Sequence, residues 1–156
     1  MIVFESSAKI LQFLHLLAAV TSIAACVHLI VRLVRSRVDR RIYVHARTLL
    51  VAYVSLYGLG SVVYPTFRVR VRAEFLDRAY PWATGLFEIK EQAATLALLP
   101  VIGLFLLTRP VWKGAERPRA TQRGHAPLLL GLSSMVLLVL LFNACVGWYL
   151  GTLGSV

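Results

Sequence analysis

Four long apolar runs restrict what this chain can fold into more than any other feature. They cover about residues 8–34, 43–64, 84–107 and 127–150 of the 156-residue sequence. A helix crosses the hydrocarbon core of a bilayer with about 20 consecutive, mostly apolar residues, so each run is long enough to span a membrane. The sequence therefore predicts an all-α integral membrane four-helix bundle, built as a single transmembrane domain over residues 1–156.

The composition agrees with a membrane protein and argues against a soluble fold. Hydrophobic residues make up 58% of the chain, against about 45–50% in soluble domains, and the mean hydropathy is +0.73. The net charge of +10 would suggest nucleic acid in a soluble protein, but no recognition motif accompanies it. We expect no nucleic acid, and a lipid bilayer whose anionic headgroups meet the basic loops on the cytoplasmic side.

The basic residues gather in the first and third loops between the apolar runs. The first loop holds Arg35, Arg37, Arg40, Arg41 and Arg47 against Asp39, and the third holds Arg109, Lys113, Arg117, Arg119 and Arg123 against Glu116. The positive-inside rule places both loops in the cytoplasm and both chain termini outside. The expected location is a bacterial cytoplasmic (inner) membrane.

Prolines and one polar connection set the predicted helix ends. Pro65 is expected to stop the second helix, and Pro127 to open the fourth as a first-turn residue. Between the second and third helices, Arg70, Glu74 and Arg78 fit a helical salt-bridge ladder. This spacing predicts a short amphipathic helix in the membrane interface, ended by the Tyr-Pro-Trp sequence at 80–82.

Three charged residues stand at the mouth of the third apolar run, where charge is rare. They are Glu88, Lys90 and Glu91. Ionisable residues at membrane depth are costly and often mark a pathway or a site. Glu88 is explained as a helix-entrance charge that complements the helix dipole. Lys90 lies on a different side, from which it can snorkel outward, and Glu91, further inward, is the carboxylate that most needs a partner.

Polar residues of the first and second helices are expected at the same depth as this cluster, in the outer half of the bundle. His15 shares its helical face with small residues, so it is expected to point inward. Tyr57 and Tyr64 reach the same level from the second helix. The predicted buried polar site therefore comprises His15, Tyr57, Tyr64, Glu88, Lys90 and Glu91. The alternatives are a packing histidine, an aromatic packing stripe and ordinary helix-entrance charges.

Two classes of function follow from these residues. In the first, the chain is a subunit or module of a membrane complex that handles protons or ions through His15, Glu88 and Glu91. No polar chain continues toward the inner side, so a partner protein would have to complete a path. In the second, the chain is a structural or accessory subunit. The GxxxG at Gly147–Gly151 and the small-residue face of the first helix then favour a protein partner or a homo-oligomer through the first and fourth helices.

A third possibility comes from a resemblance carried by two short segments. Residues 9–20 (KILQFLHLLAAV), with VRLV at 31–34, resemble the first helix of small four-helix membrane haem proteins of the HemJ-type protoporphyrinogen oxidase and CopD-like classes. Ile89-Lys90 is similar to a helix-borne lysine of the former class. The resemblance implies a b-type haem redox protein, with His15 as an axial ligand and Lys90 as a functional partner.

Signatures of hydrolytic or nucleophilic enzymes are absent from the sequence, which leans against an enzyme. There is no GxSxG, no phosphate loop and no metal-ligand spacing. Cys26 and Cys145 lie in different apolar runs and are expected to behave as small hydrophobes. Whether they ever pair is left open by the sequence.

Overall fold

The computed structural model describes residues 8–35, 39–68, 72, 77–112 and 119–153. Its helices are α1 (Ala8–Val34), α2 (Arg40–Phe67), α3 (Asp77–Ala79), α4 (Pro81–Trp112) and α5 (Arg119–Leu153). α1, α2, α4 and α5 are each long and apolar enough to cross a membrane. The predicted all-α fold with four membrane-spanning helices is confirmed.

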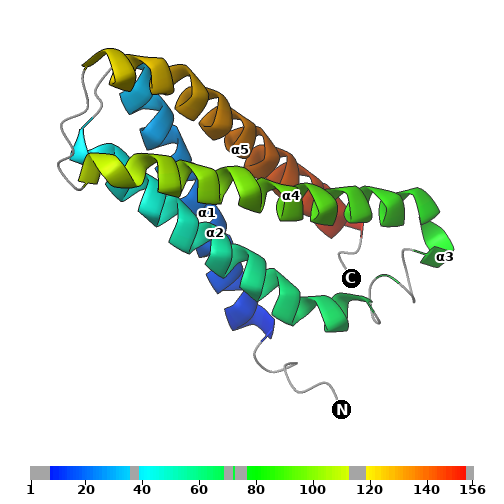
Figure 1. Ribbon diagram of the computed structural model, residues 1–156. Helices are drawn as coiled ribbons and strands as arrows, with labels where there is room; N and C mark the ends of the chain where they lie inside the picture. The colour runs from blue at the N-terminus through cyan, green and yellow to red at the C-terminus, as the bar shows by residue number, and fades with distance from the viewer. Residues whose placement is uncertain (1–7, 36–38, 69–71, 73–76, 113–118, 154–156) are drawn as a thin grey trace.

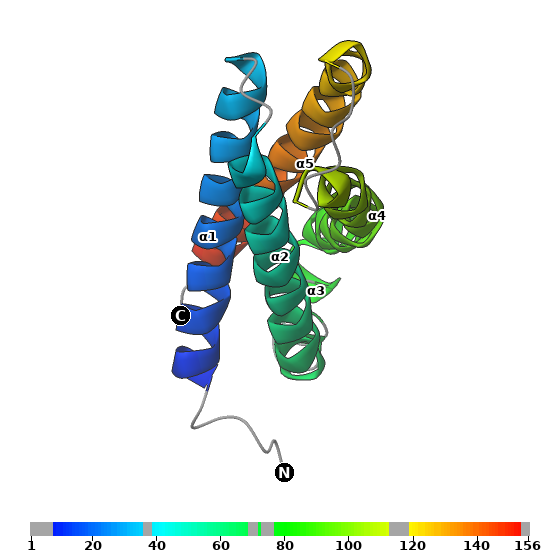
Figure 2. The same ribbon diagram turned by 60° about the vertical axis from the view of Figure 1, so that its left-hand side comes forward.

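The four long helices contact one another in a ring. α1 packs on α2, α2 on α4, α4 on α5, and α5 on α1. α1 leads into α2, and α4 leads into α5, at the same end of the bundle (Figure 1). Toward the other end of the bundle, α2 and α4 diverge. Figure 2 shows α1 and α2 side by side, with α5 crossing them at an angle. We call the half in which α1 leads into α2 and α4 leads into α5 the connection half. The half in which α1 begins and α5 ends is the terminal half.

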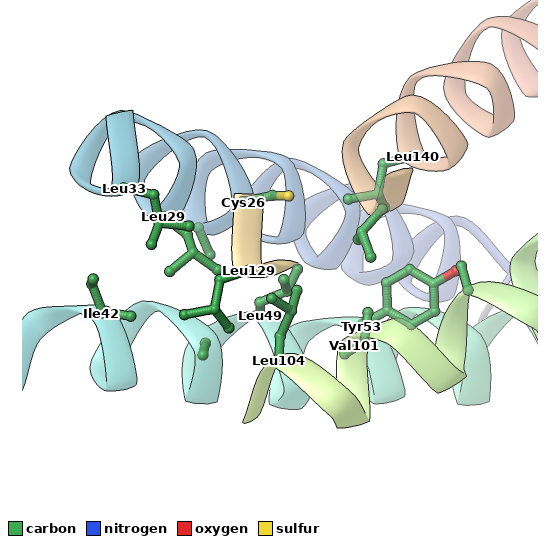
Figure 3. Packing of buried hydrophobic residues seen from close by; sticks show 14 residues of the cluster. Cys26, Leu29, Leu33, Ile42, Leu49, Tyr53, Val101, Leu104, Leu129 and Leu140 are labelled. Atoms are coloured by element: carbon green, nitrogen blue, oxygen red, sulfur yellow. The ribbon is translucent and has the colours of Figure 1, made fainter. Parts of the chain in front are cut away.

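The hydrophobic core lies in the connection half. Figure 3 shows side chains of α1 and α2 meeting those of α4 and α5 there. The fully buried members include Leu29, Ile42, Leu49, Val101, Leu104 and Val136. The small-residue face of α1 takes part, since Ser22, Ala25 and Cys26 are all buried. This outcome confirms that the small face of α1 points into the bundle.

Buried hydroxyls in this half bond to the backbone of their own helices. Ser22 donates to the Ala18 carbonyl at 2.8 Å, and Ser133 donates to the Leu129 carbonyl at 2.7 Å. The Cys26 thiol donates across the bundle to the Ser133 carbonyl at 3.1 Å. Polar groups inside a bilayer must find protein partners, because hydrocarbon offers none. These bonds let polar side chains enter the core without opening it to water.

α2, α4 and α5 extend beyond their predicted bounds at both ends. α2 continues through Pro65, α4 begins earlier than predicted at Pro81, and α5 begins before Pro127, which is therefore an interior residue. A proline removes one intrahelical hydrogen bond and frees one carbonyl. Near a membrane surface water can satisfy that carbonyl, so the helix continues where a pattern-based boundary would end it.

The predicted interfacial helix falls mainly on residues 69–71 and 73–76, which lie outside the described residues. What is described is one helical turn, α3, followed directly by α4. Tyr80 accepts the backbone hydrogen bond of Ala83 at 2.8 Å, so the Tyr-Pro-Trp sequence opens α4. α3 ends at Ala79, directly before this sequence, as expected for its stop, and Pro81 also suits the first turn of α4.

Candidate functional site

His15 of α1 packs against a glycine of α2. A Cβ placed on Gly60 would lie 3.4 Å from His15 Cε1 and 3.9 Å from Nδ1, so the ring occupies the space that a side chain would fill. His15 Nδ1 is buried and has no hydrogen-bond partner. The backbone of Leu56, one turn before Gly60, acts electrostatically on the ring. Gly60 thus lets a polar ring lie close to the α2 backbone.

Lys90 of α4 turns into the bundle. A Cβ placed on Gly147 of α5 would lie 3.0 Å from Lys90 Nζ and 3.8 Å from Cε. The ammonium also lies 5.8 Å from the centroid of the Phe87 ring. The expectation that Lys90 snorkels outward is therefore wrong. Its stem follows the α4–α5 seam because Gly147 leaves room for it there.

Both side chains lie in the terminal half of the bundle, each against a glycine of a neighbouring helix. The charge of Lys90 acts electrostatically on His15, and the charge of Glu91 acts electrostatically on Lys90. Each of the four long helices contributes one element, since α2 supplies Gly60 and α5 supplies Gly147. We call these two side chains and the two glycines the His–Lys site.

Glu88 belongs to the entrance of α4. It is exposed, and Arg72 Nη2 donates to Glu88 Oε1 at 2.6 Å. Arg72 Nε also lies 3.8 Å from Asp77 Oδ1, and the Thr84 hydroxyl donates to that same oxygen at 2.6 Å. The hydrogen bond to Glu88 and the two nearby carboxylates raise the pKa of Arg72. Arg72, from the connection between the second and third apolar runs, is therefore the partner of Glu88.

The two predicted tyrosines hold α2 against α4. The Tyr57 hydroxyl lies 3.1 Å from the Thr95 hydroxyl. The Tyr64 ring is stacked on Phe87, with the centroids 6.2 Å apart and the planes at 8°. Phe87 in turn lies beneath Lys90. Tyr64 therefore supports the wall of the His–Lys site through Phe87, which the sequence analysis did not single out.

Histidines of the connection half form a separate pair. The His28 and His45 rings lie 5.4 Å apart in an edge-on arrangement at 82°. In the described part of the chain, no group of three or more His, Cys, Asp and Glu side chains is placed to hold a metal ion. Cys26 and Cys145 are both free thiols.

One glycine of the GxxxG sequence of α5 leaves room for the Lys90 side chain of the same chain. Gly147 faces the Lys90 ammonium, while Gly151 is exposed and has nothing near the position of its missing side chain. Gly60 and Gly147 were the site residues that sequence reasoning missed in this role. Their signal was available, because an isolated glycine costs helix stability and so often marks a close approach.

Comparison of the chain with protein-family models, with curated proteins and with solved structures finds no match. The site must therefore be interpreted from its own chemistry.

Proposed function

We propose that the chain is a small membrane-embedded module that accepts and releases protons at the His–Lys site, within a larger membrane complex. The observation that carries the proposal is the placement of two basic side chains, His15 and Lys90, between four membrane helices. Basic groups at such depth are costly, and their usual explanation is a pathway or a site.

The pairing of these groups supports proton exchange. Two bases that act on each other titrate as a coupled pair, because a proton on one disfavours a proton on the other. Lys90 makes no hydrogen bond and no ion pair with any described residue, so no carboxylate holds it permanently charged. Glu91, half-buried beside it, is the group through which protons would pass to the entrance at Glu88 and Arg72.

Access to the site is from one side. The connection half carries an apolar core in which Leu49, Val101 and Val136 are fully buried. Such a core does not conduct protons, so a module of this design exchanges them with the terminal side alone. The charge pattern of the loops places that side outside the cytoplasm. A partner subunit would complete a path across the membrane.

The test is nuclear magnetic resonance of the full chain in lipid nanodiscs, with nitrogen-15 in histidine. His15→Gln identifies the His15 signals. We expect these signals to move between about pH 5 and about pH 8, where a histidine in exchange with water titrates. In Lys90→Met, the ring should keep its proton to a higher pH, because the competing positive charge is gone.

Arg109→Gln is the matched control, because it removes a basic side chain from the same helix at the connection end. It should leave the His15 titration unchanged. A His15 signal that stays constant over the whole pH range would show a packing histidine and contradict the proposal. A titration identical in wild type and Lys90→Met would show that the two groups do not share protons.

A second candidate is a b-type haem module, favoured by one observation. The buried His15 Nδ1 without a hydrogen-bond partner belongs to an imidazole with unused coordinating capacity, and Lys90 brings a second nitrogen base to the same place. His15 would hold the iron, which would supply one-electron redox chemistry, and Lys90 would be the functional partner that the resemblance implies. The purified chain should then show a Soret absorption band that His15→Ala abolishes and His28→Ala retains. A folded preparation without this band excludes the haem candidate and leaves the proton module untouched.

A further inference from the structure

A groove follows the seam between α1 and α2, and its lining includes neither His15 nor Lys90. It has a volume of about 600 Å³, within the roughly 300–1,000 Å³ typical of ligand pockets. Its walls are mostly apolar, and its lining residues include Leu14, Leu17 and Ala18 of α1 and Val44, Val51 and Leu59 of α2. Because α1 and α2 are membrane-spanning helices, this groove opens toward lipid.

Basic side chains gather at the connection end of the groove. Arg47 lines the groove itself, and the charge of Arg41 acts on His45. His28 contacts His45 edge-on. We call Arg41, Arg47, His28 and His45 the basic cluster. The guanidinium groups of Arg41 and Arg47 have no acidic partner among the described residues.

The neighbouring Arg32 is excluded from this cluster because it is already neutralised. Its Nη2 forms a salt bridge with Asp39 Oδ2, and its Nε donates to Asp39 Oδ1 at 3.3 Å. The charge of Arg41 also acts on this carboxylate, so Asp39 offsets part of the positive charge and leaves Arg47 without a salt bridge among the described residues. A ligand of complementary chemistry would carry an anionic headgroup at this level and an apolar part along the groove.

The part of the groove between Arg47 and Leu59 is about as long as one lipid leaflet is thick. The lining along α2 runs from Tyr43 to Leu59, and the twelve residues from Arg47 to Leu59 span about 18 Å. One leaflet contributes about 15 Å to a hydrocarbon core of about 30 Å. A phospholipid whose phosphate lies at the basic cluster would therefore place an acyl chain along most of the groove.

We propose that the α1–α2 groove is a specific site for an anionic phospholipid of the leaflet at the connection end. The phosphate binds Arg41 and Arg47, and one acyl chain lies between α1 and α2. A partner helix would also be apolar, but it would leave the charge at one end unexplained. The site is independent of the proposed proton function, because it uses neither His15 nor Lys90.

The experiment is native mass spectrometry of the detergent-purified full chain, titrated with phosphatidylglycerol or with phosphatidylcholine of the same acyl chains. We expect phosphatidylglycerol to bind more tightly. Each basic side chain near an anionic lipid strengthens binding about fivefold, so Arg41→Gln with Arg47→Gln should weaken phosphatidylglycerol binding roughly 30-fold. Binding of phosphatidylcholine should change little.

Two further variants separate this site from general surface charge. Arg109→Gln removes an exposed basic residue at the same end of α4 and should leave phosphatidylglycerol affinity nearly unchanged. Ser55→Trp fills the groove at an exposed lining position and should weaken binding although the basic cluster is intact. Glycerol phosphate, a headgroup without chains, should not compete.

Each of these results can overturn the proposal. Equal losses in Arg109→Gln and in the double variant would show a diffuse electrostatic attraction. Full affinity in Ser55→Trp would show that no acyl chain enters the groove, and competition by glycerol phosphate would show a phosphate site without a lipid requirement. Equal affinity for both lipids would exclude charge recognition.

Discussion

The two halves of the bundle are built from the same four helices but use different side chains where those helices meet. In the connection half, leucine, isoleucine and valine side chains interdigitate and hydroxyls bond to their own helices. In the terminal half, an imidazole and an ammonium rest against glycines. The difference teaches that the connection half supplies most of the packing. The terminal half combines a smaller buried cluster of Ala83, Val146 and Leu150 with titratable groups at membrane depth.

Exposure along single helices separates the face that packs in the core from the face that meets lipid. On α4, Leu104 is 0% exposed whereas Leu96 is 63% exposed, and on α1, Leu29 is 0% exposed whereas Leu16 is 60% exposed. Outward-facing apolar side chains are exposed in the connection half as well, since Val34 is 65% exposed. Since lipid is as apolar as leucine, close packing provides the stabilisation between membrane helices. The connection half should therefore dominate the stability of the fold.

The largest expected effect is in the connection half. Leu104→Ala should lower the free energy of unfolding by about 2–4 kcal/mol, because it leaves a cavity where four helices meet. Denaturant titration in mixed micelles, followed by circular dichroism, measures this. Leu99→Ala is the matched control on α4, at a side chain that is 70% exposed. Similar losses in the two variants would mean that the connection half is not the main source of stability.

The next effect concerns the cap of α2. Asp39 Oδ1 accepts the backbone N–H of Arg41 at 3.1 Å, which makes Asp39 the N-cap of α2. Asp39→Ala should cost about 1 kcal/mol of stability, whereas Asp39→Asn keeps a capping side chain and loses only the charge. Thermal unfolding of both variants in the same detergent separates capping from ion pairing. If the asparagine variant loses as much as the alanine variant, the salt bridge with Arg32 matters more than the cap.

The same residue makes stability depend on acid pH. Partial burial opposes ionisation of Asp39, but the hydrogen bond and charge of Arg32 and the N–H of Arg41 outweigh it and lower its pKa. Its contribution is therefore present above about pH 4, the ordinary value for aspartate, and is lost as the pH falls through the lowered pKa. Asp39→Asn should flatten the acid side of the stability profile.

The smallest effect on stability tests the terminal half. Alanine at Gly131, which is exposed with open space around it, should stabilise α5 by up to about 1 kcal/mol through helix propensity. Gly147→Ala on the same helix should show no such gain, because its Cβ would displace the Lys90 ammonium. Adding Lys90→Met should restore the gain. Equal stabilisation by Gly131→Ala and Gly147→Ala would show that Gly147 makes no room for Lys90.

Much of the fold follows from the sequence alone. A bilayer requires long apolar helices, so four runs of sufficient length predict four spans. The inward face of α1 was also predictable, because residues 22, 25 and 26 fall on one stripe of an α-helix. The level of the polar site followed from the helical rise. These features depend on local periodicity and on the solvent, and both are properties of the sequence and its environment.

The pairing of side chains was decided by the tertiary structure. A helical wheel places the Cα of Lys90 but not its long side chain, which turns inward because Gly147 of a different helix leaves space there. The position of His15 against Gly60 is likewise set by how α1 and α2 approach each other. Contacts between helices depend on crossing angles and on the space that glycines leave. The periodicity of a single helix contains no information about either. The sequence determined which charged cluster needed explaining, and only the packing of four helices decided that Lys90 turns toward Gly147 and that His15 lies against Gly60.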